Sequence, residues 1–315
     1  MSLLSVSITL PARKALKSVE HRMKIKVSHR SFPAYKDRAE VNAFIEWLAE
    51  LLGSNRHVEH GYTNRQTEKL WQFSNLYDAF SQYEWHHSGV PHLNVNGGSS
   101  AASNAEALDA LGADLGTAKC DDSMLRGTQA TMAWGGVSAH NSQWLKDNQV
   151  GLAAMVEQVA QVLRQGDLDS PKFNIDLRFN AGMTKVYSLI CDNFIIYDSR
   201  VAAALGWLVM KYCSERKLTS LPEGLRFPWA PAKEAQNTAA PKNRDPGIES
   251  EFKFPRLRRG HHHALWNMRA SWVLSKALAH PSAQGSRFHQ GSGNPLRKLE
   301  MGLFMIGYDL GSSVR

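Results

Sequence analysis

The sequence predicts a mainly α-helical protein, a helical bundle with a minor strand element near its N-terminus. Apolar residues recur at helical spacing in segment after segment, alternating runs are few, and no internal repeat interrupts the pattern. With 315 residues, 43% of them hydrophobic, the chain has room for one large domain or two packed helical subdomains. We expect a basic N-terminal segment at 1–35 and a helical domain at 36–315.

Charge and cysteine content narrow the classes of function. The chain carries 37 Lys and Arg against 29 Asp and Glu, a net charge of +8 that favours a polyanionic partner. Cys120, Cys191 and Cys213 are too widely spaced for a disulfide framework or a cysteine zinc site, and favour a reducing compartment. No apolar run is long enough to span a membrane, and residues 1–26 lack the long apolar stretch of a signal peptide. We therefore expect a cytoplasmic monomer with no membrane partner.

The first half of the chain contains two predicted helices before a long loop. Residues 37–53, DRAEVNAFIEWLAELLG, place apolar side chains at helical spacing and end at a glycine. Residues 70–85, LWQFSNLYDAFSQYEW, show the same spacing and predict a second helix. Residues 86–104 are rich in Gly, Ser, Asn and His and predict a loop, after which Asn104 is expected to cap a short helix.

Two glycines and two caps mark the middle of the chain. Trp134-Gly135-Gly136 interrupts a helical pattern, so the adjacent glycines predict either a turn between helices or a close approach of the backbone to another group. Residues 150–165 predict an amphipathic helix that stops at Gly166. Asp169 or Ser170 is suited to cap the next helix, with Pro171 in its first turn.

The second half ends in two helices that follow an irregular connection. Prolines recur between residues 218 and 256 and predict that connection. Residues 256–280 are basic and then amphipathic, and residues 295–310 predict a mostly buried helix after a Gly/Ser loop. The adjacent histidines 261–263 point about 100° apart on a helix, so they cannot easily share a metal ion. The loop histidines at 86, 87 and 92 are also weak metal candidates, and we expect neither a metal nor a cofactor.

Residues 179–212 carry the candidate chemistry. Residues 184–194 predict a helix whose buried face is formed by apolar side chains, with Lys185 on another face in the first turn. An ammonium is disfavoured beside the positive N-terminus of a helix. That position and partial burial favour a neutral, nucleophilic amine. A lysine on a solvated face is the alternative.

Asp198 is placed to return toward Lys185. The helix after Lys185 runs about 12 Å, and the extended link to Asp198 can span about 16 Å back. As the N-cap of a helix over 199–212, Asp198 would point its carboxylate at the turn before Lys185, although capping alone is the alternative. The turn at 180–183 also offers backbone N–H groups suited to bind phosphate.

The strings GMTKVYSLIC and YDSRV, whose lysine and aspartate are 13 residues apart, resemble the helix-hairpin-helix DNA glycosylases. The resemblance is closest to the 8-oxoguanine DNA glycosylase branch and covers residues 177–209, within an expected helix-hairpin-helix core at 170–213. It implies that Lys185 is the Schiff-base lysine, Asp198 the catalytic aspartate and Gly182 the last glycine of the hairpin. The hairpin here has one glycine and no proline.

The resemblance implies a DNA glycosylase with AP-lyase activity that flips a damaged or modified base out of double-stranded DNA. The base is 8-oxoguanine-like or another modified base, removed in DNA repair or in defence against foreign DNA such as that of a phage. The residues expected to contact DNA are Arg178, Asn180, Gly182, Thr184 and Arg200. Basic residues at 11–30 and 253–259 would add affinity independent of sequence.

Two alternatives remain open at this point. One is a non-catalytic DNA-binding protein of the same fold, and the other is a helical enzyme that uses Lys185 for imine chemistry on a different anionic substrate. Base stacking requires an aromatic side chain, and core packing is the competing role for each candidate. Those candidates are Trp134, Trp144, Trp207 and Trp266.

Overall fold

The computed structural model describes residues 32–64, 67–166, 178–234, 242–248 and 250–311. The described chain is mainly helical with one two-stranded sheet, as the sequence predicts. The strand expected near the N-terminus and the helix start expected at 169–171 lie outside the described residues. The first helix of the expected hairpin falls largely in the same gap, so the helix-hairpin-helix arrangement stays a prediction.

The N-terminal part confirms one predicted helix and corrects another. Helix α2 (Phe32–Lys36) leads into α3 (Ala39–Gly53), which matches the prediction. The helix predicted over 70–85 is wrong in its first part, because β2 (Lys69–Phe73) pairs antiparallel with β1 (His60–Asn64). Trp71 and Phe73 are buried while Gln72 between them is exposed, which is the period of two expected of a strand. Helix α4 (Leu76–Ser81) follows.

The middle of the chain forms four helices after a loop that contains the short 3-10 turn η1 (Pro91–Leu93). They are α5 (Ala101–Thr117), α6 (Asp121–Trp134), α7 (Ser138–Asp147) and α8 (Leu152–Gln165). Ser100 caps α5 in place of Asn104, whose side chain is buried and bonds to Trp85 and Trp134 instead. The turn predicted at Gly135-Gly136 separates α6 from α7.

The C-terminal half contains the helices that carry the candidate residues. They are α9 (Met183–Ile190), α10 (Ser199–Glu215), α11 (His261–Ala279) and α12 (Pro295–Ile306). Helix α9 is shorter than the predicted 184–194. Short 3-10 turns lie at η2 (Glu223–Leu225), η3 (Pro281–Ala283) and η4 (Arg287–His289). In the described part of 218–256, η2 is the one helical turn, which confirms the irregular connection.

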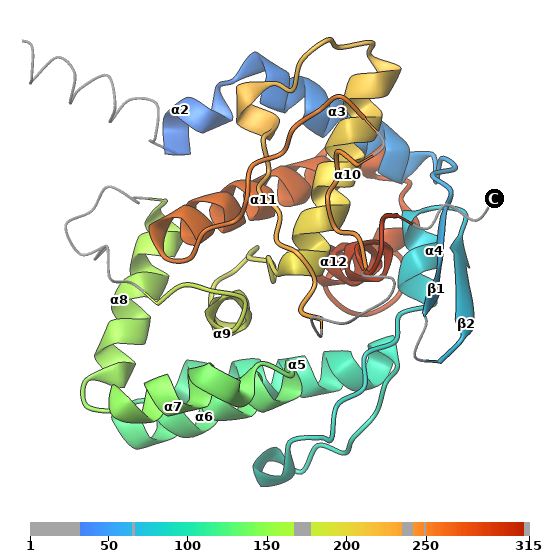
Figure 1. Cartoon of the computed structure of the whole chain (residues 1–315). Coiled ribbons are helices and arrows are strands. Elements are labelled where there is room, and N and C mark those ends of the chain that lie inside the picture. Colours follow the sequence, from blue (N-terminus) through green and yellow to red (C-terminus); the bar gives the residue numbers. More distant parts are fainter. Residues whose placement is uncertain (1–31, 65–66, 167–177, 235–241, 249, 312–315) are drawn as a thin grey trace, which may run out of the picture.

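Figure 1 shows two groups of helices with α9 between them. Helices α5, α6 and α7 lie along one side, and α3, α10, α11 and α12 lie on the other. The larger hydrophobic cluster joins α3, the strands, α4, α10 and α12, whereas the smaller one joins α6, α8 and α9 with one face of α11. The start of α9 therefore lies between two packed cores. Within the described ranges, no helix is both long enough and apolar enough to cross a membrane.

The contact between α12 and α4 makes a stability prediction. A Cβ built on Gly302 would lie 2.7 Å from the carbonyl oxygen of Leu76, a backbone atom that cannot move aside cheaply. Gly302→Ala should therefore lower the free energy of unfolding by roughly 1–3 kcal/mol, as overpacking does. Gly116→Ala in α5 meets nothing within 4 Å and should raise it by a few tenths up to about 1 kcal/mol. Urea unfolding measures both, and a Gly302→Ala protein as stable as Gly116→Ala would contradict this packing.

Candidate active site

Lys185 and Asp198 lie together, as the sequence predicts. The Nζ atom of Lys185 is 3.5 Å from Oδ2 of Asp198, and it donates a hydrogen bond to the carbonyl oxygen of Ala181 at 3.0 Å. The two side chains are only 6% and 13% exposed. A Cβ on Gly135 would overlap the Cδ and Cε atoms of Lys185, so the close approach predicted for this glycine is made by the lysine stem.

Asp198 both caps α10 and pairs with Lys185. Its Oδ1 accepts hydrogen bonds from the backbone N–H groups of Arg200 at 2.9 Å and Val201 at 3.2 Å, which leaves Oδ2 for the lysine. Burial raises the pKa of this carboxyl, but the charges of Lys185 and Arg200 and the Val201 hydrogen bond outweigh it, so the pKa lies below its usual range. The group is therefore an ionised, oriented carboxylate at neutral pH.

The residue before Asp198 is held from two sides. The hydroxyl of Thr184, which is fully buried, accepts the N–H of Tyr197 at 2.9 Å and donates to Oδ1 of Asn267. Nε2 of His263 lies 2.7 Å from the carbonyl oxygen of Tyr197. Burial lowers the pKa of His263 to about 4, so at neutral pH the ring is uncharged and its Nε2–H donates to that carbonyl. These hydrogen bonds hold the backbone on the N-terminal side of Asp198 and so fix the position of its Cα atom.

The turn before Lys185 differs from the expected phosphate site. Oδ1 of Asn180 accepts the backbone N–H groups of Gly182 at 2.8 Å and Met183 at 3.0 Å. The N–H groups that were expected to face a phosphate are thus occupied within the protein. Nδ2 of Asn180 and Nη2 of Arg178 both donate to Oδ1 of Asn141 at 3.0 Å, which joins the turn to α7.

The residues predicted to contact DNA take different places. Gly182 and Thr184 are buried, so in this conformation they position α9 and do not reach the surface. Arg178 stacks on the ring of Trp144, with its guanidinium carbon 4.9 Å from the ring centroid. Arg200 lies near Asp198 among aromatic rings.

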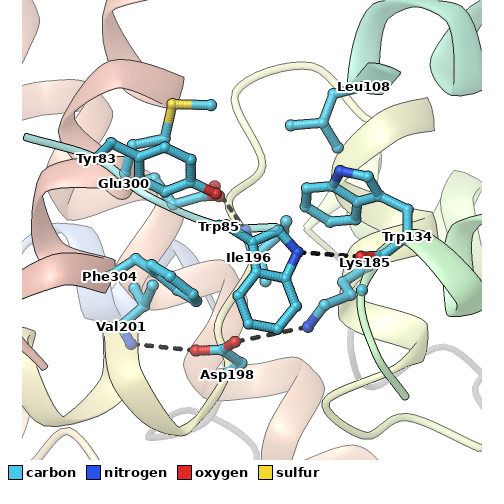
Figure 2. Close-up of a pocket in the computed structure, with 12 residues that line it drawn as sticks. Tyr83, Trp85, Leu108, Trp134, Lys185, Ile196, Asp198, Val201, Glu300 and Phe304 are labelled. Atoms are coloured by element: carbon cyan, nitrogen blue, oxygen red, sulfur yellow. Dashed lines mark hydrogen bonds and ion pairs between the residues drawn. The ribbon is translucent and has the colours of Figure 1, made fainter. Parts of the chain in front are cut away.

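Figure 2 shows the Lys185–Asp198 pair at one side of a pocket with aromatic walls. Trp85, Trp134 and Phe304 form those walls, and the Nε1–H of Trp85 donates to the carbonyl oxygen of Trp134 at 3.0 Å. The free space measures about 30 Å³, which holds one or two water molecules. The remaining lining residues are Tyr83, Leu108, Gly135, Ile196, Val201, Glu300 and Met301.

A second carboxyl group, that of Glu300, belongs to the same pocket. Its Oε2 accepts the backbone N–H of Ile196 at 2.8 Å and Nη1 of Arg297 at 2.6 Å. Burial raises the pKa of Glu300, and the nearby Arg297 does not fully offset it. Tyr83 lies beside it in the pocket lining. No local sequence pattern marks Tyr83 or Glu300 as part of a site.

Of the four tryptophans proposed for stacking, only Trp134 lines this pocket. Trp144 lies under Arg178, and Trp207 and Trp266 pack in the larger core. Trp85 and Phe304 share no local motif with Lys185, so the sequence did not indicate them. The adjacent glycines 135 and 136 are the one local indication of the pocket, because they predict a close approach of another group to the backbone, and the Lys185 stem makes that approach.

Metal-site geometry and comparison with known proteins were two further sources of information on this site. No group of three or more His, Cys, Asp or Glu side chains among the described residues is arranged to hold a metal ion. No protein-family model, curated protein or solved structure matches the chain. The site must therefore be interpreted from its own chemistry: a buried amine beside an ionised carboxylate, at the edge of an aromatic pocket. Such a pair can form a covalent imine and can stabilise a developing positive charge.

The geometry at Gly135 predicts a change in the pKa of Asp198. Gly135→Ala should push the Lys185 amine away from Oδ2, so the pKa of Asp198 should rise toward its usual value. NMR titration of ¹³C-labelled aspartate measures it. Lys185→Met should produce the same rise, and Gly116→Ala, far from any contact, should leave the titration unchanged. An Asp198 pKa that stays low in both variants would mean that Lys185 is not what holds it down.

Proposed function

We propose that the protein is a DNA glycosylase with AP-lyase activity, in which Lys185 is the nucleophile and Asp198 stabilises the charge that develops on the sugar. The observation that supports this most is the 3.5 Å separation of Nζ and Oδ2 within a buried, aromatic-walled pocket. The net charge of +8 agrees with a polyanionic partner. The nucleophile belongs to the protein, so the reaction needs no metal or organic cofactor.

The proposed reaction begins when a nucleotide is flipped out of the duplex. The ammonium of Lys185, which pairs with Asp198 in the free protein, first gives up a proton to water. The resulting neutral amine attacks C1′ of the deoxyribose, and the bond from C1′ to the base breaks with its electron pair leaving on the base. Asp198, ionised and fixed by α10, stabilises the positive charge on the sugar and accepts a proton that Lys185 releases.

The covalent intermediate accounts for the lyase step. The sugar ring opens as the C1′–O4′ bond breaks and O4′ takes up a proton, which leaves an iminium between Lys185 and C1′. Loss of a proton from C2′ then expels the 3′ phosphate by β-elimination. Water hydrolyses the imine and returns the free amine.

The pocket has to open before a base can enter it. Its free space of about 30 Å³ is too small for a purine or a pyrimidine, and Trp85 occupies the space above the catalytic pair. A Cβ on Gly136 would lie 3.4 Å from the Trp85 ring, so the glycine backbone borders the indole. Once Trp85 moves, Trp134 and Phe304 are placed to stack on an aromatic base. Tyr83 and Glu300 are placed to bond its polar edge.

The closed pocket is also the observation that favours the second candidate, a DNA-binding protein of the same fold without catalysis. The proposed substrate is an 8-oxoguanine-like or otherwise modified base. Its removal would serve DNA repair or defence against foreign DNA. The proposal also includes a monomer acting in the cytoplasm. The thiols of Cys120, Cys191 and Cys213 are all free, in keeping with a reducing compartment.

Borohydride trapping tests the nucleophile. The protein is incubated with duplexes that carry an abasic site or 8-oxoguanine, and the imine is then reduced. We expect a covalent protein–DNA adduct for the unmodified protein and none for Lys185→Ala, because the amine is absent. Lys146→Ala, an exposed lysine of α7, serves as the matched control and should form the adduct normally. Normal DNA binding with no adduct on any lesion would favour the non-catalytic candidate.

Asp198→Asn tests the carboxylate separately, because asparagine also caps a helix. This variant should bind DNA with little change and lose base excision by about 100-fold or more, in the range typical of a lost electrostatic stabiliser. Single-turnover release of the base measures it. An unchanged rate in Asp198→Asn would remove Asp198 from the mechanism.

A further inference from the structure

We propose that Arg200 and Arg244 form a site for one backbone phosphate of DNA, next to the Lys185–Asp198 pair. This inference rests on the proposed function for the identity of the anion, and on the structure for the site itself. The two arginines come from different segments: Arg200 is the second residue of α10, and Arg244 lies in the connection at 242–248.

Arg200 is held by ring faces. Its guanidinium carbon lies 4.1 Å from the ring centroid of Phe304, 4.8 Å from that of Tyr308 and 5.5 Å from that of Trp85. Ring faces attract a cation but accept no ordinary hydrogen bond from its five N–H groups. No described residue accepts a side-chain hydrogen bond from Arg200. The rings thus hold the side chain in place, while none of its N–H groups bonds to another side chain among the described residues.

Arg244 is 8% exposed and lies against the same turn of α10. Its Nη1 donates to the hydroxyl of Ser199, and its Nε donates to the carbonyl oxygen of Tyr308 at 3.4 Å. Its other terminal nitrogen, Nη2, has no acceptor in the part of the chain that the structure describes. Burial and the like charge of Arg200 lower the pKa of Arg244 to about 10, in spite of nearby carboxylates.

Three positive charges converge on one carboxylate beside the two arginines. Arg200, Arg244 and Lys185 all act on Asp198, which is a single carboxylate. Glu234, the other carboxylate that affects Arg244, is already paired with Lys242 at 2.7 Å. Positive charges that are partly withdrawn from water and share one counter-ion are unfavourable unless another anion joins them. The N-terminus of α10 adds to the positive potential.

Phosphate is the anion that this arrangement fits. Guanidinium groups bind phosphate oxygens through paired N–H donors with well-defined geometry, and two of them here have donors to spare. A deoxyribose whose C1′ is attacked by Lys185 carries phosphates on both sides, so one of them must pass close to the pair. A phosphate at this position would hold the sugar in register with the amine and the carboxylate.

The site is built before the ligand arrives. A Cβ on Gly307 would overlap the backbone carbonyl of Arg200, so the end of α12 packs directly on the start of α10. That contact places Phe304 and Tyr308 beside the Arg200 side chain. Because the aromatic rings and Ser199 already fix both guanidinium groups, little side-chain freedom is lost when a phosphate binds.

A methylphosphonate scan tests the site. The probe is a duplex with a tetrahydrofuran abasic-site analogue, in which each nearby phosphate is replaced in turn by a neutral methylphosphonate. The unmodified protein should lose affinity by about tenfold at one particular position, as expected for the loss of a charge-assisted hydrogen bond. Arg200→Met and Arg244→Met should each bind the unsubstituted duplex more weakly and should lose less than the unmodified protein at that position, because one arginine remains. The double variant should lose nothing more there.

Arg287→Met is the matched control, because it removes another arginine stacked on a ring, 4.1 Å from the centroid of Tyr77. It should keep the scan pattern of the unmodified protein. Three results would overturn the proposal: no position-specific loss in the unmodified protein, variants that lose affinity equally at every position, or variants that keep the full position-specific loss. The scan on the unmodified protein needs no variant. If Arg244→Met does not fold, Arg200→Met alone tests whether the position-specific loss depends on an arginine of this site.

The two proposals fail in different ways. A borohydride adduct together with a scan that shows no coupling to either arginine refutes the phosphate site and leaves the glycosylase chemistry standing. Coupling to both arginines without an adduct on any lesion supports the phosphate site and refutes the glycosylase.

Discussion

The ion pair between Lys185 and Asp198 is the contact on which the candidate site depends. One carboxylate oxygen of Asp198 caps α10 and the other contacts the Lys185 amine. The hydrogen bonds that cap the helix therefore also orient the carboxylate toward the amine. Gly135 leaves room for the lysine stem, and Thr184 holds the strand-like link between the two helices. Loss of either charge would leave the other poorly compensated where little water reaches.

The sequence predicted this pair because both residues occupy helix starts, which have local signatures. Lys185 follows a hairpin turn, and Asp198 precedes a long apolar helix. The strand at 69–73 was predicted as helix because the aromatic residues of 70–85 recur with a period close to 3.6. The same spacing also arises when a short strand is followed by a separate short helix. The pocket walls could not be predicted, since Trp85 and Phe304 come from a loop and from α12 and meet only through tertiary packing.

The surroundings of the pair suggest how affinity and chemistry are connected. Several positive charges lie near the one carboxylate of Asp198, and the Trp85 ring lines the pocket beside the pair. Under the proposed function, a bound nucleotide would bring an anion to these positive charges and would take the place of the Trp85 ring. Trp85 also contacts Arg200, so a phosphate that engages this arginine would act on the residue that closes the pocket. Backbone recognition and base entry would then be steps of one process.

The assignment of Lys185 as the nucleophile is tested most directly by peptide mapping of the borohydride-reduced adduct formed on abasic DNA. After nuclease digestion of the DNA, mass spectrometry locates the residue that carries the sugar remnant. The expected result is the added mass on the peptide that contains Lys185, and on no other peptide. The same mass on another lysine or on the N-terminal amine would contradict the proposed mechanism.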